Sequence, residues 1–294
     1  MFRLFLAFLV FHQKSLHQVD VFILLAFFEF LHLNKFTVSN ITNYSSALKS
    51  KMALLGFNIT QFEDLRVQSF MKALQKQSPM SVRIKPIFDI QTLKQICNLC
   101  DSTYQGQVFK VAYLLGFFAF LRLSNLCPHS AATFDMFKHL TRGDVFCHHN
   151  GMKILIKWSK TMQMGNQAKV ISIPLLNSEI CPVLAIRKLL AITPGSKNAP
   201  LFQFKEGQVY QPLIDTRVRK HLKNILQMLK IENSNLTFHA FRRSGATFAF
   251  QNNAALQNIQ QHGTWTSECV WRYISDSTVA STQVSDIFRS VLSV

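Results

Sequence analysis

The stretch KQSPMSVRIKPIF, which begins at Lys76, constrains the fold of this chain more than any other. It contains two prolines, Pro79 and Pro86, and a proline disfavours helix at the residue before it. Apolar blocks lie on both sides, so we predict an extended basic linker between two domains. The predicted boundaries are 1–78 for the first domain, 79–86 for the linker and 87–294 for the second domain.

The block before the linker has the pattern of a helical bundle. Apolar residues recur three or four positions apart, as at Val38, Ile41, Tyr44 and Leu48, and Gly56 follows as a helix stop. The predicted helices cover residues 3–11, 18–32, 38–55 and 61–76. No segment here has the alternation of a strand, so we expect an all-helical domain.

The first 33 residues are apolar enough to be mistaken for a membrane segment. The first apolar run ends at Phe11, and Glu29 and His32 break the second. Neither run therefore reaches the roughly 18 uninterrupted apolar residues of a membrane span. No small-residue cleavage site follows the first run. Two apolar core helices are favoured over a signal peptide, and we expect no membrane partner.

The block after the linker has a mixed pattern. Asn150-Gly151 predicts a type I′ turn inside the hairpin VFCHHNGMKILIKWSK, and AKVISIPLL predicts a third strand. The predicted helices cover 90–101, 106–122, a segment capped near Ser178, 212–230, a segment from about 238, and 281–293 at the end of the chain. The predicted fold class is therefore two-domain and mainly α with a small β-sheet.

The charge of the chain points to a polyanionic partner. Lys and Arg number 32 against 15 acidic residues, a formal net charge of +17. Such an excess favours nucleic acid over a membrane surface. The predicted DNA-binding residues, in the linker and on the basic helix 212–230, are Arg83, Lys85, Arg217, Arg219, Lys220 and Lys223.

The six cysteines are few and irregularly spaced, as in proteins of a reducing compartment. Cys97 and Cys100 form a C-x-x-C, but no second pair lies at zinc spacing, and Cys147 precedes two histidines. Buried or loop positions are favoured over a metal site. We expect neither a metal nor a cofactor.

Several residues that can handle a phosphate are spread along the second block. His239 and Arg242, in LTFHAFRRSGATFAF, stand three apart and share a helix face. A guanidinium matches a phosphate, and an imidazole can move a proton near neutral pH. Arg122 ends a long apolar run, and Tyr273 follows Arg272. Each has an ordinary alternative: a wet helix edge, a snorkelling arginine or a buried structural tyrosine.

Taken in order, these residues resemble the tyrosine recombinase, or phage integrase, family. The spacing runs from Arg122, in FLRLSN, through a hairpin lysine to HAFRRSGAT, and then to Tyr273. The resemblance covers nearly the whole chain. It implies a helical core-binding domain before the linker and an α+β catalytic domain after it.

The resemblance also assigns the site residue by residue. Arg122, His239 and Arg242 match the conserved arginines and the His-x-x-Arg box, and Tyr273 matches the nucleophile. Lys160, in SKT, matches the hairpin lysine, with Lys157 as the less favoured choice. Asn125 stands where the family usually has a glutamate of largely structural role.

One segment departs from the family pattern. The family usually has His or Trp directly after the glycine that corresponds to Gly263, but this chain has Thr264 there and Trp265 one step later. Mobile-element recombinases of the DIRS and Crypton kind have a similar G-x-W spacing. Trp265 is therefore assigned to this position, with His262 as the second candidate.

The resemblance implies a DNA recombinase or integrase that works through a 3′-phosphotyrosine. It also implies a homotetramer on double-stranded DNA and allows a monomer for the free protein. The expected location is the nucleus for a eukaryotic mobile element and the cytoplasm otherwise. The alternatives are an inactive, element-derived DNA-binding protein, which the altered segment at Thr264 favours, and a type IB topoisomerase, which the helical first block disfavours.

Overall fold

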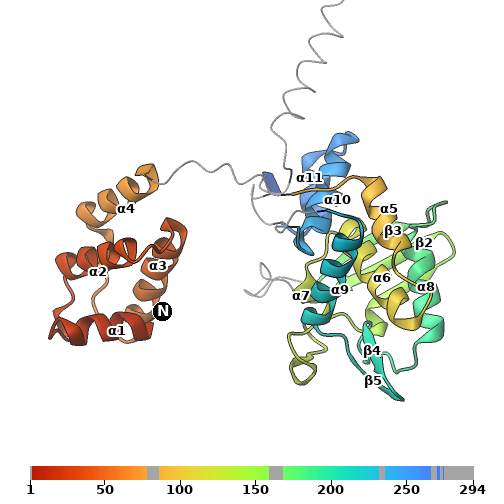
Figure 1. Ribbon diagram of the computed structural model, residues 1–294, viewed down its shortest axis with the longest axis horizontal. Helices are drawn as coiled ribbons and strands as arrows, with labels where there is room; N and C mark the ends of the chain where they lie inside the picture. The colour runs from red at the N-terminus through yellow and green to blue at the C-terminus, as the bar shows by residue number, and fades with distance from the viewer. Residues whose placement is uncertain are drawn as a thin grey trace, which may run out of the picture. The chain divides into compact units, whose positions relative to one another are not determined.

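The computed structural model describes residues 2–77, 86–158, 168–231, 236–265, 270–271 and 274. The chain forms two compact units, Met1–Arg83 and Ile84–Val294 (Figure 1). Their boundary falls within the predicted linker, of which the structure describes only Pro86. The assignment of the units as core-binding and catalytic domains stays a prediction.

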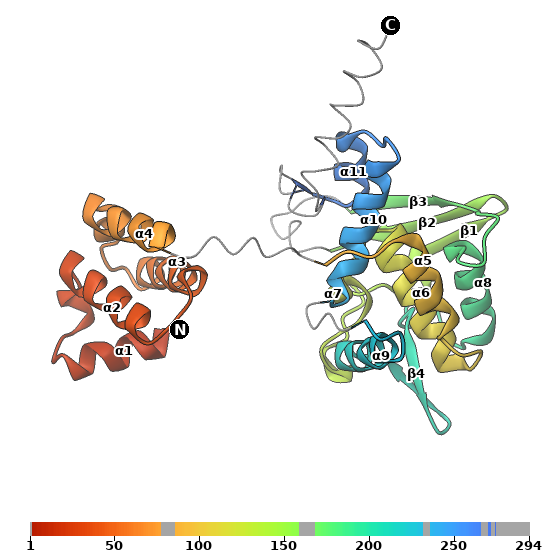
Figure 2. The same cartoon turned by 45° about the horizontal axis from the view of Figure 1, so that its top comes forward.

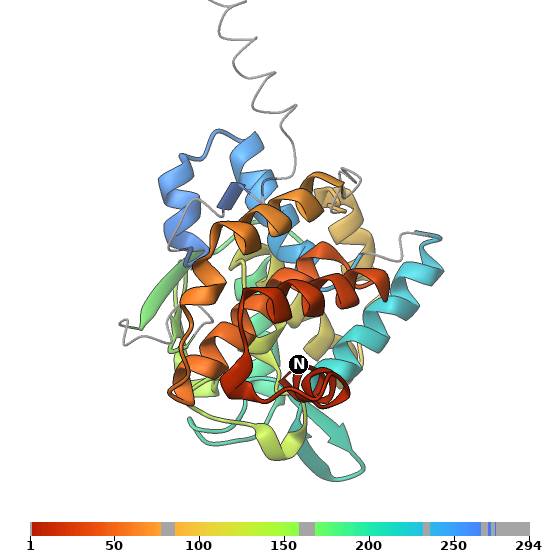
Figure 3. The same ribbon diagram turned by 90° about the vertical axis from the view of Figure 1, so that its left-hand side faces the viewer.

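All the regular elements in the described residues of the first unit are helices, and they are seen together in Figure 3. Asp20 and Thr37 cap the second and third helices by accepting the backbone N–H groups of Ile23 and Asn40. The elements are α1 Phe2–Phe11, η1 Leu16–Gln18, α2 Val21–Leu33, α3 Val38–Leu54, η2 Thr60–Glu63 and α4 Leu65–Gln77. The predicted fourth helix thus begins later, because a 3₁₀ turn occupies its first residues.

The core of this unit is built from the apolar run at the start of the chain. Phe5, Phe27 and Phe28 are fully buried and pack with Ile41 of α3. The prediction of apolar core helices is therefore confirmed. In the described part of the chain, no helix has both the length and the apolar character needed to cross a membrane.

The second unit is built around α6, Tyr104–Phe118, whose side chains are buried over almost its whole length. In Figures 1 and 2, α6 runs between α8, Pro182–Ile192, and α9, Asp215–Met228. Helix α10, His239–Gln251, also packs directly on α6. The shorter helices are α5 Ile90–Asn98, α7 Leu123–Leu126 and α11 Leu256–His262, with 3₁₀ turns η3 Ala131–Thr133 and η4 Arg142–Asp144.

The predicted three-stranded sheet is present, with antiparallel order β1-β2-β3. Met152, Ile154 and Ile156 of β2 alternate inward, and Ile154 pairs with Ile171 of β3. A second sheet, the β4–β5 hairpin, was not predicted. The strands are β1 Val145–His148, β2 Gly151–Ile156, β3 Lys169–Pro174, β4 Gln203–Glu206 and β5 Val209–Pro212.

The turn of the first hairpin differs from the prediction. The pair His148↔Gly151 closes the ladder, so the loop residues are His149 and Asn150, and neither has the positive φ of a type I′ turn. Gly151 instead begins β2. A Cβ on it would lie 2.6 Å from the carbonyl oxygen of Ile173, so glycine is needed here for the close approach of β3.

Several predicted helix limits also differ from the structure, and the helix 90–101, for example, ends at Asn98. The helix 106–122 ends at Phe118, since Phe120 has φ +48° and cannot continue a right-handed helix. The helix capped near Ser178 has Cys181 as its N-cap, with Pro182 in the first turn. The helix 212–230 begins at Asp215, because its first predicted residue belongs to β5.

Candidate active site

The segment that follows α6, from Phe118 to Arg122, forms the centre of the candidate site. His262 Nε2 lies 2.8 Å from the carbonyl oxygen of Phe118, and Arg242 Nη1 donates to that of Phe120. A helix end leaves carbonyl groups without intrahelical partners, and these side chains bind two of them. Helices α10 and α11 thus fix the backbone that leads into Arg122.

The sequence predicts Arg122 as the last residue of a long helix. In the structure it is instead the N-cap residue of α7. Its backbone N–H donates to Oδ1 of Asn125 at 3.2 Å. Its side chain is half-buried, and Nη1 is buried with no hydrogen-bond partner among the described residues. A buried guanidinium nitrogen of this kind is chemically suited to an anionic oxygen.

Arg242 lies at the base of the site and is 2% exposed. Besides its bond to the Phe120 carbonyl, it donates from Nη2 to the carbonyl oxygen of Gly263 at 2.6 Å. Its guanidinium lies over the Trp265 ring, 4.0 Å from the centroid. These contacts place the Arg242 guanidinium against two segments: the one after α6 that leads into Arg122, and the one after α11 that contains Gly263 and Trp265.

In the segment Gly263-Thr264-Trp265 the tryptophan ring lies against the glycine two residues before it. Thr264 has φ +56°, in the left-handed region, and this turns the chain back on itself. Trp265 is 5% exposed, and a Cβ on Gly263 would lie 1.9 Å from its ring. The indole therefore lies on the glycine and contacts Arg242, and the role of Trp265 in the site stays a prediction.

His262, the second candidate, has a different setting. Burial lowers its pKa, the bond to the Phe118 carbonyl opposes this, and the charge of Arg242 lowers it further. The neutral imidazole is therefore favoured near pH 7, bound to a carbonyl at the end of α6. His262 therefore holds α11 against α6 through its hydrogen bond to the Phe118 carbonyl.

His239 is the first residue of α10 and is half-buried. Arg242 follows three residues later in the same helix, so the predicted shared face is confirmed. The small residues Ser244, Gly245 and Ala246, which follow Arg242 and Arg243, are buried. A Cβ on Gly245 would lie 2.0 Å from the Phe117 carbonyl oxygen, so α10 contacts the last turn of α6 directly.

Lys160 and Tyr273 lie outside the described residues, and their neighbours in sequence are held at the site. The carbonyl of Trp158, two residues before Lys160, accepts the side-chain amide of Asn125 at 2.8 Å. Ile274, the residue after Tyr273, is 5% exposed and belongs to the buried cluster of Phe120 and Trp265. Asn125 was not among the predicted site residues, although the sequence marked its position.

Lys157, the less favoured hairpin lysine, forms an ion pair with Asp144. Its Nζ lies 2.5 Å from Asp144 Oδ2. That carboxylate oxygen also accepts the backbone N–H and the hydroxyl of Thr141, each at 2.7 Å. This largely buried ion pair ties the residue that follows β2 to η4 and disfavours Lys157 for chemistry.

The predicted DNA-binding residues of α9 differ among themselves. Lys220 and Lys223 are exposed, and Arg219 lies 3.4 Å from Asp215. Arg217 is instead bound to the β4–β5 hairpin, where it pairs with Glu206 and lies 4.0 Å from the Phe204 ring centroid. Arg83 and Lys85, also predicted, lie outside the described residues.

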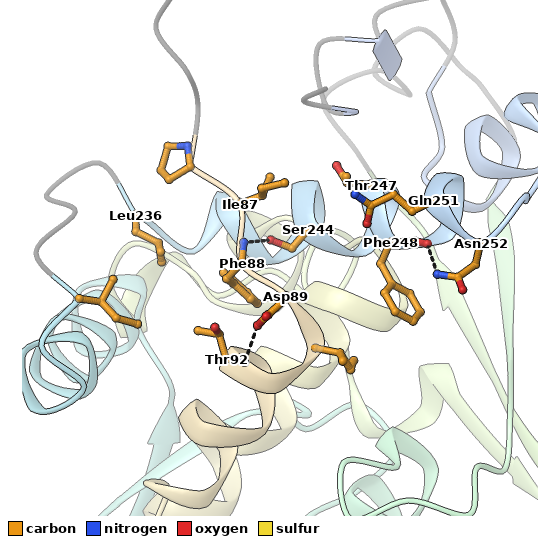
Figure 4. Close-up of a pocket in the computed structure, with 13 residues that line it drawn as sticks. Ile87, Phe88, Asp89, Thr92, Leu236, Ser244, Thr247, Phe248, Gln251 and Asn252 are labelled. Atoms are coloured by element: carbon orange, nitrogen blue, oxygen red, sulfur yellow. Dashed lines mark hydrogen bonds between the residues drawn. The ribbon is translucent and has the colours of Figure 1, made fainter. Parts of the chain in front are cut away.

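A groove of about 690 Å³ lies beside α10, away from this chemistry (Figure 4). The groove runs along residues 86–90, where the described part of the second unit begins. Phe88 N–H donates to Ser244 Oγ at 2.9 Å, and Arg243 Nη1 donates to the Pro86 carbonyl at 2.8 Å. One turn of α10 therefore holds both the candidate site, through Arg242, and the start of the unit.

The cysteines of the two sequence motifs lie in different surroundings. Cys97 and Cys100 are buried, and burial raises the pKa of Cys97 to about 12. Cys147 is exposed on β1. Among the described residues, no group of three or more His, Cys, Asp or Glu side chains is placed to hold a metal ion.

Solved structures with a similar fold are DNA integrases and recombinases. No family model matches this chain, and no curated protein matches it in sequence. The Tn1549 transposon integrase in complex with circular intermediate DNA is 13% identical, with 92% of this chain and 86% of that one covered and a TM-score of 0.59. The chain has the tyrosine recombinase fold.

Two further structures agree. The XerH site-specific recombinase bound to palindromic difH substrate, a post-cleavage complex, is 16% identical, with 94% of this chain and 73% of that one covered and a TM-score of 0.61. A lambda integrase dimer bound to a COC′ core site is 13% identical, with 93% and 88% covered and a TM-score of 0.56. The predicted fold class is thus confirmed, and the DIRS or Crypton subtype stays a prediction.

Proposed function

We propose that this chain is a site-specific DNA recombinase that cuts and rejoins DNA through a 3′-phosphotyrosine intermediate. The observation that carries this proposal is the pair of arginines at the end of α6. Arg242 binds the carbonyl of Phe120, and two residues later Arg122 presents a buried Nη1 with no hydrogen-bond partner among the described residues. The similarity to DNA-bound Tn1549 integrase, XerH and lambda integrase supports DNA as the partner.

The proposed reaction is an in-line displacement at a DNA phosphate. The Tyr273 hydroxyl oxygen forms a bond to phosphorus while the bond from phosphorus to the 5′-oxygen breaks. His239 accepts the phenolic proton, and Lys160 donates a proton to the leaving oxygen. Arg122 and Arg242 stabilise the negative charge that develops on the phosphate oxygens. The ester keeps the bond energy, so the reverse attack of a DNA hydroxyl reseals the strand.

The altered segment at Thr264 is compatible with this chemistry. The Trp265 ring lies over the guanidinium of Arg242, and both side chains are buried. A tryptophan that stands one position later than in the family pattern therefore contacts Arg242. We propose that Trp265 orients Arg242 and does not itself transfer a proton, since an indole N–H only donates a hydrogen bond.

The proposed assembly is a homotetramer on double-stranded DNA, because recombination exchanges four strands, and a monomer when free. The basic residues in the linker and on α9 are proposed to contact DNA phosphates. A nuclear location is proposed for a chain from a eukaryotic mobile element, and a cytoplasmic one otherwise.

A nicked suicide substrate tests the proposal, because loss of the short 5′ fragment traps the covalent adduct on a denaturing gel. Wild-type protein is expected to form the adduct. Tyr273→Phe should bind DNA and form none, and Arg242→Ala should slow adduct formation by about 100-fold to 1000-fold. Tyr210→Phe, a tyrosine exchange on β5, is the matched control.

Two outcomes would overturn the proposal. An adduct that persists in Tyr273→Phe would remove the nucleophile from the mechanism. A wild-type protein that binds DNA tightly and never forms an adduct on a range of substrates would establish the binding-only alternative.

A further inference from the structure

Asn125 connects two parts of the candidate site that are far apart in sequence. Its Oδ1 accepts the backbone N–H of Arg122 at 3.2 Å, and its Nδ2 donates to the carbonyl of Trp158 at 2.8 Å. The residue is 4% exposed. The backbone N–H can only donate and the carbonyl can only accept, so these partners fix the orientation of the amide.

The backbone of Asn125 is equally engaged. Its N–H donates to the Arg122 carbonyl at 2.9 Å, and its own carbonyl accepts the N–H of Leu140 at 3.0 Å. All four hydrogen bonds are made in a buried setting, where each missing partner would be costly. Asn125 therefore joins three segments: the one that contains Arg122, the one before η4, and residues 151–158, which comprise β2 and the two residues after it and are called the β2 arm.

The β2 arm is held twice at this point. Trp158 is bound through its carbonyl to Asn125, and the preceding Lys157 is bound through its side chain to Asp144. The two contacts are made by consecutive residues. The β2 arm thus has a fixed position relative to Arg122 at Trp158, its last residue.

The chemistry of an amide is needed for this bridge. A carboxylate only accepts hydrogen bonds, so at residue 125 it would place a negative oxygen against the Trp158 carbonyl. It would also add a negative charge three residues from Arg122, the arginine proposed to bind a phosphate. Asparagine makes both bonds and leaves the charge of Arg122 unpaired with any acid among the described residues.

We propose that Asn125 is a positioning residue that locks the β2 arm to Arg122, and so sets the leaving-group acid relative to the phosphate-binding arginine. This inference rests on the proposed function, in which Lys160, two residues after Trp158 in sequence, protonates the 5′-oxygen. Asn125 does not touch the reacting atoms. Its effect is on the cleavage step and on the transfer of the proton, not on DNA affinity.

Single-turnover cleavage with two substrates tests the proposal. Asn125→Ala should cleave a normal nicked substrate about tenfold more slowly than wild type, as when one orienting hydrogen bond is lost. A substrate with a 5′-bridging sulfur needs no proton on its leaving group, so it should recover most of this loss. DNA affinity should stay within about twofold. Asn252→Ala is the matched control, because that exposed amide also donates to one carbonyl, of Phe248, at 2.8 Å.

Asn125→Asp supplies a second readout that general destabilisation would not give. The protonated carboxyl can again donate to the Trp158 carbonyl, while the ionised one cannot. The ratio of Asn125→Asp to wild-type cleavage should therefore rise as pH falls. An equal loss on both substrates, a loss confined to DNA affinity, or a flat pH ratio would each overturn the proposal.

A measurement without DNA separates this proposal from the proposed function. Hydrogen–deuterium exchange of the full chain should show faster exchange at the Arg122 amide in Asn125→Ala, since its acceptor is removed, and no change there in Asn252→Ala. If wild type forms no adduct, the proposed function fails, and the positioning role fails with it. If wild type forms the adduct while Asn125→Ala leaves the Arg122 amide and both cleavage rates unchanged, only the positioning role is overturned.

Discussion

The guanidinium of Arg242 lies 4.0 Å from the centroid of the Trp265 ring, and both side chains are almost fully buried. A desolvated cation–π contact of this kind contributes about 2 kcal/mol. Trp265→Ala should therefore slow adduct formation on the order of thirtyfold. Trp265→Phe keeps an aromatic face and should lose less. Rates of adduct formation measured at saturating DNA give the comparison, and equal losses in the two variants would contradict a role for the ring face.

Gly263→Ala should reproduce the effect of Trp265→Ala. The added Cβ would lie 1.9 Å from the indole, so the ring must leave its place over Arg242. Because both changes remove the same contact, the double variant should be no slower than Trp265→Ala alone. Additive losses would show that Gly263 acts independently of the ring.

Gly245→Ala should destabilise the second unit although alanine favours helix. Helix propensity alone predicts a gain of about 1 kcal/mol, whereas overlap in a packed core costs about 1–3 kcal/mol or more. With a Cβ only 2.0 Å from the Phe117 carbonyl oxygen, we expect the overlap to dominate. The three tryptophans, Trp158, Trp265 and Trp271, all lie in this unit, so thermal unfolding followed by tryptophan fluorescence reports on it.

Gly207→Ala is the matched control for that experiment. Gly207 has φ +58°, and nothing lies within 4 Å of the position that a Cβ would take, so only backbone strain of about 1–2 kcal/mol is expected. An unfolding midpoint for Gly245→Ala above that of Gly207→Ala would show that α10 and α6 can move apart without loss.

The stability of the second unit should fall as pH falls from about 7.5 to about 5.5. Burial lowers the pKa of His262 in the folded chain, and also that of His139 and His221. The unfolded chain then binds more protons than the folded chain below the ordinary histidine pKa of about 6.5. The contribution of the neutral rings is therefore complete above that pH and is lost as pH falls toward the lowered values.

His262→Gln should weaken this pH dependence, because the glutamine amide can donate to the Phe118 carbonyl without titrating. The measurement is the fluorescence unfolding midpoint across the pH range. His149→Gln, in the exposed turn of the first hairpin, controls for the exchange itself. An equal change of slope in both variants would exclude a particular contribution of His262.

The helices and the main hairpin were predictable because their patterns are local. The three-residue spacing of His239 and Arg242 placed both on one helix face, and the structure has both in α10. The β4–β5 hairpin was missed, although Gly207 between two short alternating runs was an available signal. Its strands are only four residues long, too short for the pattern to stand out.

The break after α6 could not be predicted from its own residues. The apolar run up to Leu121 continues the helical pattern, and nothing within it ends the helix at Phe118. The partners that bind the released carbonyls lie far along the chain: Arg242 is 122 residues after Phe120, and His262 is 144 residues after Phe118. Tertiary contacts therefore decide where Arg122 sits, and a local pattern carries no trace of them.

The lysines of α9 should contribute to DNA binding more than Arg217 does. Lys220 and Lys223 are exposed, three residues apart on one helix face, whereas Arg217 pairs with Glu206 and stacks on Phe204. A lysine that neutralises one phosphate adds about 0.9 to the slope of log affinity against log salt concentration. Lys220→Ala and Lys223→Ala should each lower the slope by about this amount. Arg217→Ala should change it less and lower the fluorescence unfolding midpoint instead, because it leaves Glu206 without its partner.

Lys188→Ala is the matched control, since this exposed lysine lies on α8, and α6 runs between helices α8 and α9 (Figure 2). Filter-binding titrations from about 50 to about 200 mM salt give the slopes. Equal slopes for the lysine variants of α8 and α9 would mean that the total charge of +17, and not this face of α9, attracts DNA. A larger change in Arg217→Ala than in the lysine variants would mean that DNA displaces the arginine from Glu206, and α9 would then engage DNA from its hairpin side.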